Sequence, residues 1–121
     1  MTGDLFANEP PRNLLPFDGQ VLLLRGIMPD DDADRTFDRL LSGIVWQQET
    51  ARMAGKEIPV PRLTAWFGEV AYRYSGVYHP ASPFPAKVAP LRDLAENLAG
   101  VAFNTVLLNQ YRDGRDSVSW H

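Results

Sequence analysis

The stretch FNTVLLNQYRDGRDSVSWH, residues 103–121, decides most of what the sequence says about the fold. Phe103 to Leu108 is apolar apart from Asn104 and Thr105, which predicts a strand buried on both faces. Asn109 and Tyr111 extend this strand with polar side chains, and the Asp-Gly pair at 113–114 predicts a tight turn. We expect a second short strand after the turn, running to the terminal histidine.

The composition is that of an ordinary globular protein. The 121 residues are 45% hydrophobic and 22% charged, which excludes an intrinsically disordered sequence and fits one domain over residues 1–121. There is no cysteine, so disulfides, thiolate zinc sites and iron–sulfur clusters are excluded. The apolar runs are far shorter than a membrane span, and the N-terminus has no secretory leader pattern. We therefore expect a cytoplasmic protein with no membrane partner.

Charge is distributed unevenly along a chain whose net charge is −3. Residues 49–92 carry six basic and three acidic side chains, whereas residues 1–48 carry four basic and eight acidic ones. A basic segment in an acidic chain is typical of a local phosphate-contacting surface. A chance fluctuation over so short a segment explains the asymmetry as well.

The rest of the chain predicts an α+β fold. An acidic run followed by apolar residues at helical spacing predicts a helix over 31–43, and the same spacing closed by Gly100 predicts another over 89–99. Residues 49–61, with two prolines, predict a long irregular loop. Further strands are expected over Val21–Leu24, Leu63–Phe67 and Ala71–Tyr78.

Five short segments then occur in an order typical of one enzyme family. They are Asp4-Leu5-Phe6, Pro61-Arg62, Gly68-Glu69, Tyr72-Arg73-Tyr74-Ser75-Gly76 and the ending Asn109-x-Tyr111-x-Asp113-Gly114-x-Asp116-x-x-x-Trp120-His121. In this order they resemble the AlkB family of Fe(II)- and 2-oxoglutarate-dependent dioxygenases. These enzymes hydroxylate the alkyl carbon of N-alkylated bases in DNA or RNA, with O₂ as oxidant, and the alkyl group is then lost as an aldehyde.

The resemblance covers the whole chain and corresponds to the N-terminal part of a family domain. It implies a nucleic-acid-recognition cover of helices and strands, followed by a double-stranded β-helix, or jelly roll. We accordingly expect an extended arm over 1–16, the cover over 17–100 with both helices, and the first jelly-roll strands over 101–121. In an incomplete jelly roll, Phe103 to Leu108 would lack sheet partners, which predicts self-association through unpaired strands.

The resemblance also assigns the cofactor contacts. His121 matches the first Fe(II) ligand, and the matching roles of Asn109 and Tyr111 are hydrogen bonds to 2-oxoglutarate. The two side chains lie two residues apart on one strand and share a face. If the family resemblance is set aside, Asn109 and Tyr111 are interpreted as the polar end of a strand that hydrogen-bonds to the turn at 113–114. The family's aspartate and second histidine ligands match no residue of this chain, so we expect it to bind neither Fe(II) nor 2-oxoglutarate stably and to be inactive alone.

Substrate contacts follow from the same resemblance. Tyr72 and Tyr74 would line the pocket of a flipped-out base, within the segment that includes Ser75 and Gly76. The loop over 51–58 would reach the nucleic acid, with Met53 as its intercalating group. Four basic side chains are candidates for phosphate contact, namely Arg52, Lys56, Arg62 and Arg73. Two other interpretations remain open, a non-catalytic nucleic-acid-binding protein and a small α+β interaction module.

Overall fold

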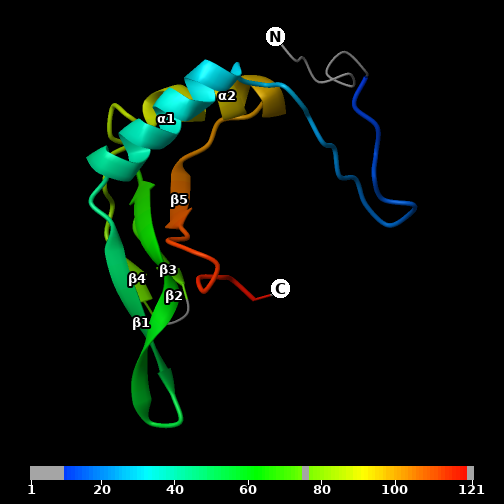
Figure 1. Ribbon diagram of the computed structural model, residues 1–121. Coiled ribbons are helices and arrows are strands. Elements are labelled where there is room, and N and C mark those ends of the chain that lie inside the picture. The colour runs from blue at the N-terminus through cyan, green and yellow to red at the C-terminus, as the bar shows by residue number, and fades with distance from the viewer. Residues whose placement is uncertain (1–9, 75–76, 120–121) are drawn as a thin grey trace. The chain divides into compact units, whose positions relative to one another are not determined.

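The computed structural model describes residues 10–74 and 77–119. Along these residues, helices and strands follow one another as α1 (Asp30–Gly43), β1 (Gln47–Met53), β2 (Lys56–Gly68), β3 (Tyr72–Tyr74), β4 (Val77–His79), α2 (Ala89–Ala99) and β5 (Thr105–Gln110) (Figure 1). All pairings between these strands are antiparallel, which confirms the α+β class. The chain forms two compact units, Met1–Phe37 and Asp38–His121.

In the first unit, Asn13 closes a loop whose turn lies at residues 18–19. Its Oδ1 accepts hydrogen bonds from the backbone N–H groups of Leu15 and Val21, at 3.1 and 2.9 Å, and its Nδ2 donates to the Gly19 carbonyl at 2.9 Å. The strand predicted over Val21–Leu24 is wrong, because only an isolated bridge between Asn13 and Leu22 forms there. An aliphatic run makes a strand only where a neighbouring strand is present to pair with it.

Both helices form where the sequence predicts them. Helix α1 begins with three aspartates in its first turn, and Asp32 forms an ion pair with Arg35. Helix α2 has a proline in its first turn and ends at Gly100, whose φ of 72° and N–H bond to the Glu96 carbonyl (2.8 Å) are those of a left-handed cap.

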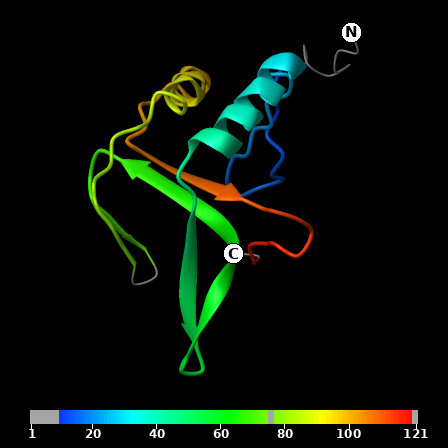
Figure 2. The same ribbon diagram turned by 60° about the vertical axis from the view of Figure 1, so that its left-hand side comes forward.

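The main sheet of the second unit has the order β1-β2-β5. Strand β2 pairs Ala65 with Leu108 and Phe67 with Val106 of β5. These four side chains alternate along their strands and therefore share one face, on which the C-terminal turn of α1 and the start of α2 pack (Figure 2). The core formed there contains Ile44, Ala65 and Val88, bordered by Leu40, Trp46, Phe67, Phe84, Val106 and Leu108.

Burial of β5 on both faces was a wrong expectation. Val106 and Leu108 pack on the core, whereas Leu107 between them is 56% exposed. The expected lack of a sheet partner is also wrong, because β5 pairs with β2 over six residues. Strand β2 is 13 residues long and pairs with β5 over residues 63–68 and with β1 over residues 56–59 and 63–64, so residues 63–64 lie between both neighbours.

The irregular loop predicted over 49–61 is a hairpin of β1 and β2 instead. Ala54 and Gly55 form its two-residue turn with φ angles of 51° and 76°, the positive pair that suits a tight hairpin. Pro59 pairs with Thr50 of β1, on a part of β2 that does not pair with β5. The N–H that proline lacks is therefore not needed for a second set of strand hydrogen bonds. The register shifts between Gln48 and Thr50, and this irregularity accommodates the second proline.

Two further strand predictions are corrected. Ala71–Tyr78 is not one strand, because β3 and β4 are separate strands that pair with each other in antiparallel orientation. The strand expected after the turn at 113–114 does not form within the described residues 111–119. A single backbone bond, from Ser117 N–H to the Pro61 carbonyl at 2.8 Å, attaches that segment to β2 instead of a ladder.

The hairpin turn yields a stability prediction. Ala54 holds a left-handed conformation that costs an L-residue with a Cβ about 1 kcal/mol, and asparagine tolerates it better. Ala54→Asn should therefore stabilise the fold by about 0.5–1 kcal/mol, measured as an increase in the urea midpoint. Gly55→Ala, at φ 76°, is the matched control and should destabilise it. A destabilised Ala54→Asn variant would contradict this turn geometry.

Candidate functional site

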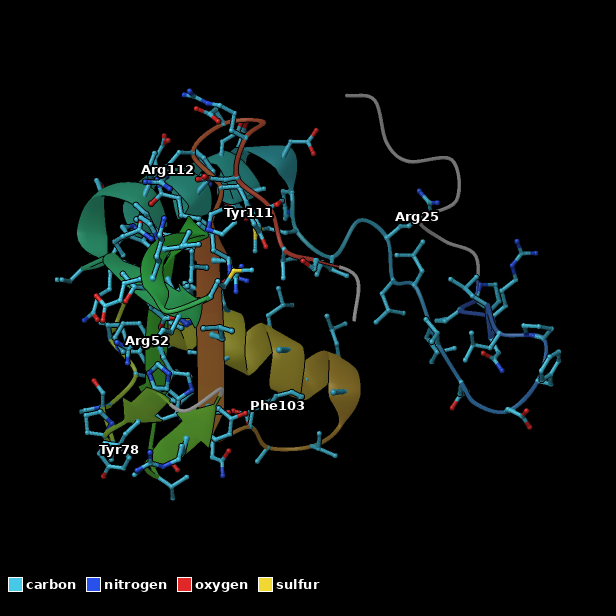
Figure 3. All side chains as sticks on the ribbon, turned by 90° about the horizontal axis from the view of Figure 1, so that it is seen from below. Arg25, Arg52, Tyr78, Phe103, Tyr111 and Arg112 are labelled. Carbon is cyan, nitrogen blue, oxygen red and sulfur yellow. The ribbon has the colours of Figure 1, made fainter. Side chains whose placement is uncertain are left out.

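The sheet face turned away from the helices carries the candidate co-substrate residues. Asn109 pairs with Thr64, and Leu107 pairs with Trp66, so these residues alternate with the core-facing set. Tyr111 follows the end of β5 and is 46% exposed (Figure 3). The Asn109 amide donates to the Tyr111 hydroxyl at 3.4 Å, so the structure brings these two predicted residues together.

An ion pair between Arg112 and Asp116 holds the segment that follows Tyr111, residues 112–117 (the braced segment). The Arg112 guanidinium donates to Asp116 through Nε to Oδ2 (2.7 Å) and Nη2 to Oδ1 (3.2 Å), and the Arg112 backbone N–H donates to Oδ2 at 2.9 Å. The Asp116 side chain is only 9% exposed. These hydrogen bonds from Arg112 favour the charged carboxylate and hold the pKa of Asp116 below its ordinary value of 3.8. The same pairing raises the pKa of Arg112.

The braced segment is also fixed to the β1–β2 hairpin. Arg112 Nη1 donates to Gln48 Oε1 at 3.4 Å, and Arg62 Nη1 donates to the Ser117 carbonyl at 3.3 Å. Gln48 in turn donates through Nε2 to the Val60 carbonyl at 2.8 Å, within the irregular stretch of β2. Arg62, a predicted phosphate contact, is thus half-buried and bonded to the backbone beyond β5.

Three aromatic rings gather on the helix-free face next to β3. Trp66 of β2 stacks with Tyr72, with ring centroids 6.0 Å apart and planes at 12°. His79 lies 5.4 Å from Trp66 and 6.4 Å from Tyr72. The cluster attaches the β3–β4 hairpin to the sheet and presents Tyr72 with 45% of its surface exposed.

Gly68 provides the space for the Trp66 ring. A Cβ at position 68 would come within 2.5 Å of Trp66 Cη2 and 2.9 Å of Thr105 Cγ2, closer than real contacts allow. Because Trp66 holds Tyr72, this glycine indirectly sets where the candidate base-binding tyrosine stands.

Met53, Arg52 and Lys56 occupy the end of the β1–β2 hairpin. Met53 is 60% exposed, and the two cations flanking the turn are exposed as well. In Figures 1 and 2 the β1–β2 and β3–β4 hairpins both point away from α2. The remaining predicted residues, Ser75, Gly76 and His121, lie outside the described residues, as does the side chain of Tyr74.

Sequence reasoning missed the residues that position the site. Arg112 and Asp116 stand four apart around an Asp-Gly turn, a spacing that could have indicated an ion pair across it. Trp66 alternates with two core residues, which could have placed it on the opposite face. No comparable signal marks His79 or Gln48, whose contacts arise from strand pairing.

A pocket of about 320 Å³ lies beside the end of α1, with Trp66 among its lining residues. Its lining includes Ile44, Ala65, Phe67 and Pro85, and none of the predicted site residues. Within residues 10–74 and 77–119, no group of three or more histidine, aspartate or glutamate side chains is placed to hold a metal ion. Neither helix of this part of the chain is long and apolar enough to cross a membrane.

Comparison with known proteins identifies the family of this chain. The family model of the 2OG-Fe(II) oxygenase superfamily matches residues 20–121. The rat alpha-ketoglutarate-dependent dioxygenase alkB homolog 3 is 38% identical over 103 residues, which cover 84% of this chain and 35% of the rat protein. The chain belongs to the AlkB family of 2OG-Fe(II) oxygenases.

Other AlkB relatives show the same partial overlap. The Arabidopsis thaliana DNA oxidative demethylase ALKBH2 is 30% identical over 124 residues, covering 95% of this chain and 39% of that protein. The human alkB homolog 3 is 34% identical, over 84% of this chain and 36% of its own length. The chain thus spans little more than a third of the length of these relatives.

The AlkB family implies two bound groups, 2-oxoglutarate and Fe(II), and the described residues fit 2-oxoglutarate. Asn109 Nδ2–H and Tyr111 O–H are neighbouring donors on one exposed face, as a carboxylate of 2-oxoglutarate requires. For Fe(II), the described residues offer no cluster of ligands, and His121 lies outside them.

The Arg112–Asp116 pair predicts how stability depends on pH. With its pKa depressed in the folded state, Asp116 stabilises the fold above its unfolded-state pKa, and this contribution is lost as the pH falls through the folded value. Below about pH 4, wild-type stability should fall more steeply than that of Asp116→Asn, with the two curves converging in acid. Urea titrations measure this, with exposed Asp93→Asn as control. Parallel curves for wild type and Asp116→Asn would contradict it.

Overpacking beneath Trp66 gives a second prediction for this site. Gly68→Ala should destabilise the fold by about 1–3 kcal/mol, because Trp66 or Thr105 must move. The control is Gly114→Ala, where an added Cβ meets no atom within 4 Å. Thermal denaturation compares the two, and equal midpoints would show that the Trp66 ring does not depend on this space.

Proposed function

We propose that this chain forms the nucleic-acid-recognition cover and the first jelly-roll strands of a dioxygenase that oxidatively removes alkyl groups from nucleic-acid bases. The observation that carries the proposal is the shared, helix-free sheet face. It presents the Asn109–Tyr111 donor pair at the end of β5 and Trp66 on the paired strand β2, and Tyr72 and His79 of the β3–β4 hairpin pack against Trp66. A co-substrate carboxylate and a base would thus be held beside each other.

In this proposal, Asn109 and Tyr111 orient 2-oxoglutarate by donating hydrogen bonds to it. Both donors are exposed and bonded to each other, so a carboxylate can replace a weak 3.4 Å contact with charge-assisted ones. His121 would be an Fe(II) ligand, as the family motif assigns it. When bound, Fe(II) and 2-oxoglutarate supply the oxidation of the alkyl carbon.

Tyr72 would stack on the target base after that base has flipped out of the nucleic-acid strand. Its ring is already stacked on Trp66, so little conformational entropy is lost when a base packs on it. Tyr74, two residues along β3, would take part in the same pocket with Ser75 and Gly76. This assignment supports a base rather than a flexible aliphatic substrate, because a fixed aromatic ring favours a flat partner.

The β1–β2 hairpin would hold the nucleic-acid backbone. Arg52 and Lys56 flank an exposed turn and can approach phosphates, and Met53 is exposed enough to insert between bases. Names of the relatives agree with this substrate class, since the Arabidopsis protein is a DNA oxidative demethylase. Arg62 would position the segment beyond β5 rather than contact phosphate.

The co-substrate assignment is tested by NMR titration of the chain with 2-oxoglutarate. We expect weak binding that shifts the backbone amide resonances of residues 109–111, and an affinity about tenfold lower in Tyr111→Phe and Asn109→Ala, because each loses a donor to a charged group. Gln110→Ala, on the other face of β5, should behave as wild type. A shift that survives both substitutions would contradict the assignment. Nucleic-acid binding without any response to 2-oxoglutarate would favour a non-catalytic binding protein.

A further inference from the structure

We propose that Arg73 and Tyr78 form a second nucleic-acid contact, a stacking platform for an unpaired base that neighbours the base held at Tyr72. The pair lies on the outer face of the β3–β4 hairpin, opposite the aromatic cluster. This proposal rests on the proposed function, and it adds a contact with the strand on either side of the target base.

The register of the hairpin separates two faces. Tyr72 pairs with His79, and both rings lie against Trp66. The next pair is Arg73 with Tyr78, and neighbouring pairs in an antiparallel ladder point to opposite faces. Arg73 and Tyr78 are therefore directed away from the Trp66 side.

The Arg73–Tyr78 pair is exposed and preorganised. The guanidinium carbon of Arg73 lies 5.6 Å from the centroid of the Tyr78 ring, within the range of a cation–π contact. Tyr78 is 58% exposed and lies at the periphery of its unit (Figure 3). The hairpin is attached through its other face, so the Tyr78 ring is available for a ligand.

The chemistry of the pair fits a single-stranded nucleic acid. An exposed tyrosine ring can stack with a base, and an adjacent guanidinium can reach a phosphate, which together form the usual contacts to unpaired strands. In a duplex, each internal base is already stacked on both faces, so no base face is free to stack on the Tyr78 ring. The sequence segment that contains the pair is also net basic, because residues 49–92 carry six basic and three acidic side chains.

The position of the pair matches the path of such a strand. Tyr72 and Arg73 are consecutive residues, so the two faces are separated by one thickness of backbone. If one base enters the Tyr72 face, the strand must pass the edge of this hairpin, and an adjacent base then meets Tyr78. The β1–β2 hairpin also points away from α2 (Figures 1 and 2), and its exposed Arg52 and Lys56 can hold further phosphates.

Fluorescence anisotropy with labelled oligothymidine, at several salt concentrations, tests the platform. Tyr78→Ala should weaken binding about 5- to 100-fold with an unchanged salt slope, because it removes stacking and no charge. Tyr78→Phe keeps the ring and should bind as wild type. Arg73→Gln should reduce the salt slope by about 0.7, the effect of one phosphate contact on a single strand.

Two controls separate this proposal from the proposed function. Arg52→Gln should weaken binding through the other hairpin, and an abasic strand should be indifferent to Tyr78→Ala. If Arg52→Gln weakens binding but Tyr78→Ala does not, the platform is refuted and the nucleic-acid function stands. Equal losses on thymidine and abasic strands would also refute stacking at Tyr78. If the wild-type chain shows no salt-dependent binding, the nucleic-acid assignment itself fails, and the platform fails with it.

Discussion

Strand β2 pairs with β1 along one part of its length and with β5 along another, and the other features of the second unit depend on this double pairing. Because its side chains alternate, Ala65 and Phe67 join the core with Val106 and Leu108. Trp66 is thereby directed to the helix-free face, where it meets Tyr72 and His79. One strand thus supplies both the hydrophobic core and the support for the candidate substrate site.

The positions of Asn109 and Tyr111 on the helix-free face depend on polar contacts. Asn109 is placed by the β2–β5 ladder, but Tyr111 and the residues after it lie beyond the strand. Their backbone is held by Asp116, which binds the Arg112 side chain and main chain together, and by the link from Arg112 to Gln48. A site at the end of a strand needs such bracing, because ladder hydrogen bonds no longer fix its geometry.

Local patterns predicted the elements whose causes are local. Helix α1, helix α2 and the Gly100 cap follow from periodicity and capping, which act within a few residues. The predicted loop over 49–61 is wrong because a proline breaks a strand only where its missing N–H is needed, and both prolines fall where β2 needs only β1 as a partner. The predicted double burial of β5 failed because hydrophobicity shows that a strand is apolar but not how many of its faces are covered.

The sequence by itself determined the α+β class, both helices, the family and the pairing of Asn109 with Tyr111 on one face, because these depend on periodicity and on ordered motifs. Only the tertiary structure decided that Trp66 and His79 support Tyr72, that Arg62 bonds the Ser117 carbonyl, and that Arg73 and Tyr78 form a separate outer face. These contacts depend on strand register, and a shift of one residue would reverse every face, so no local pattern along the chain could specify them.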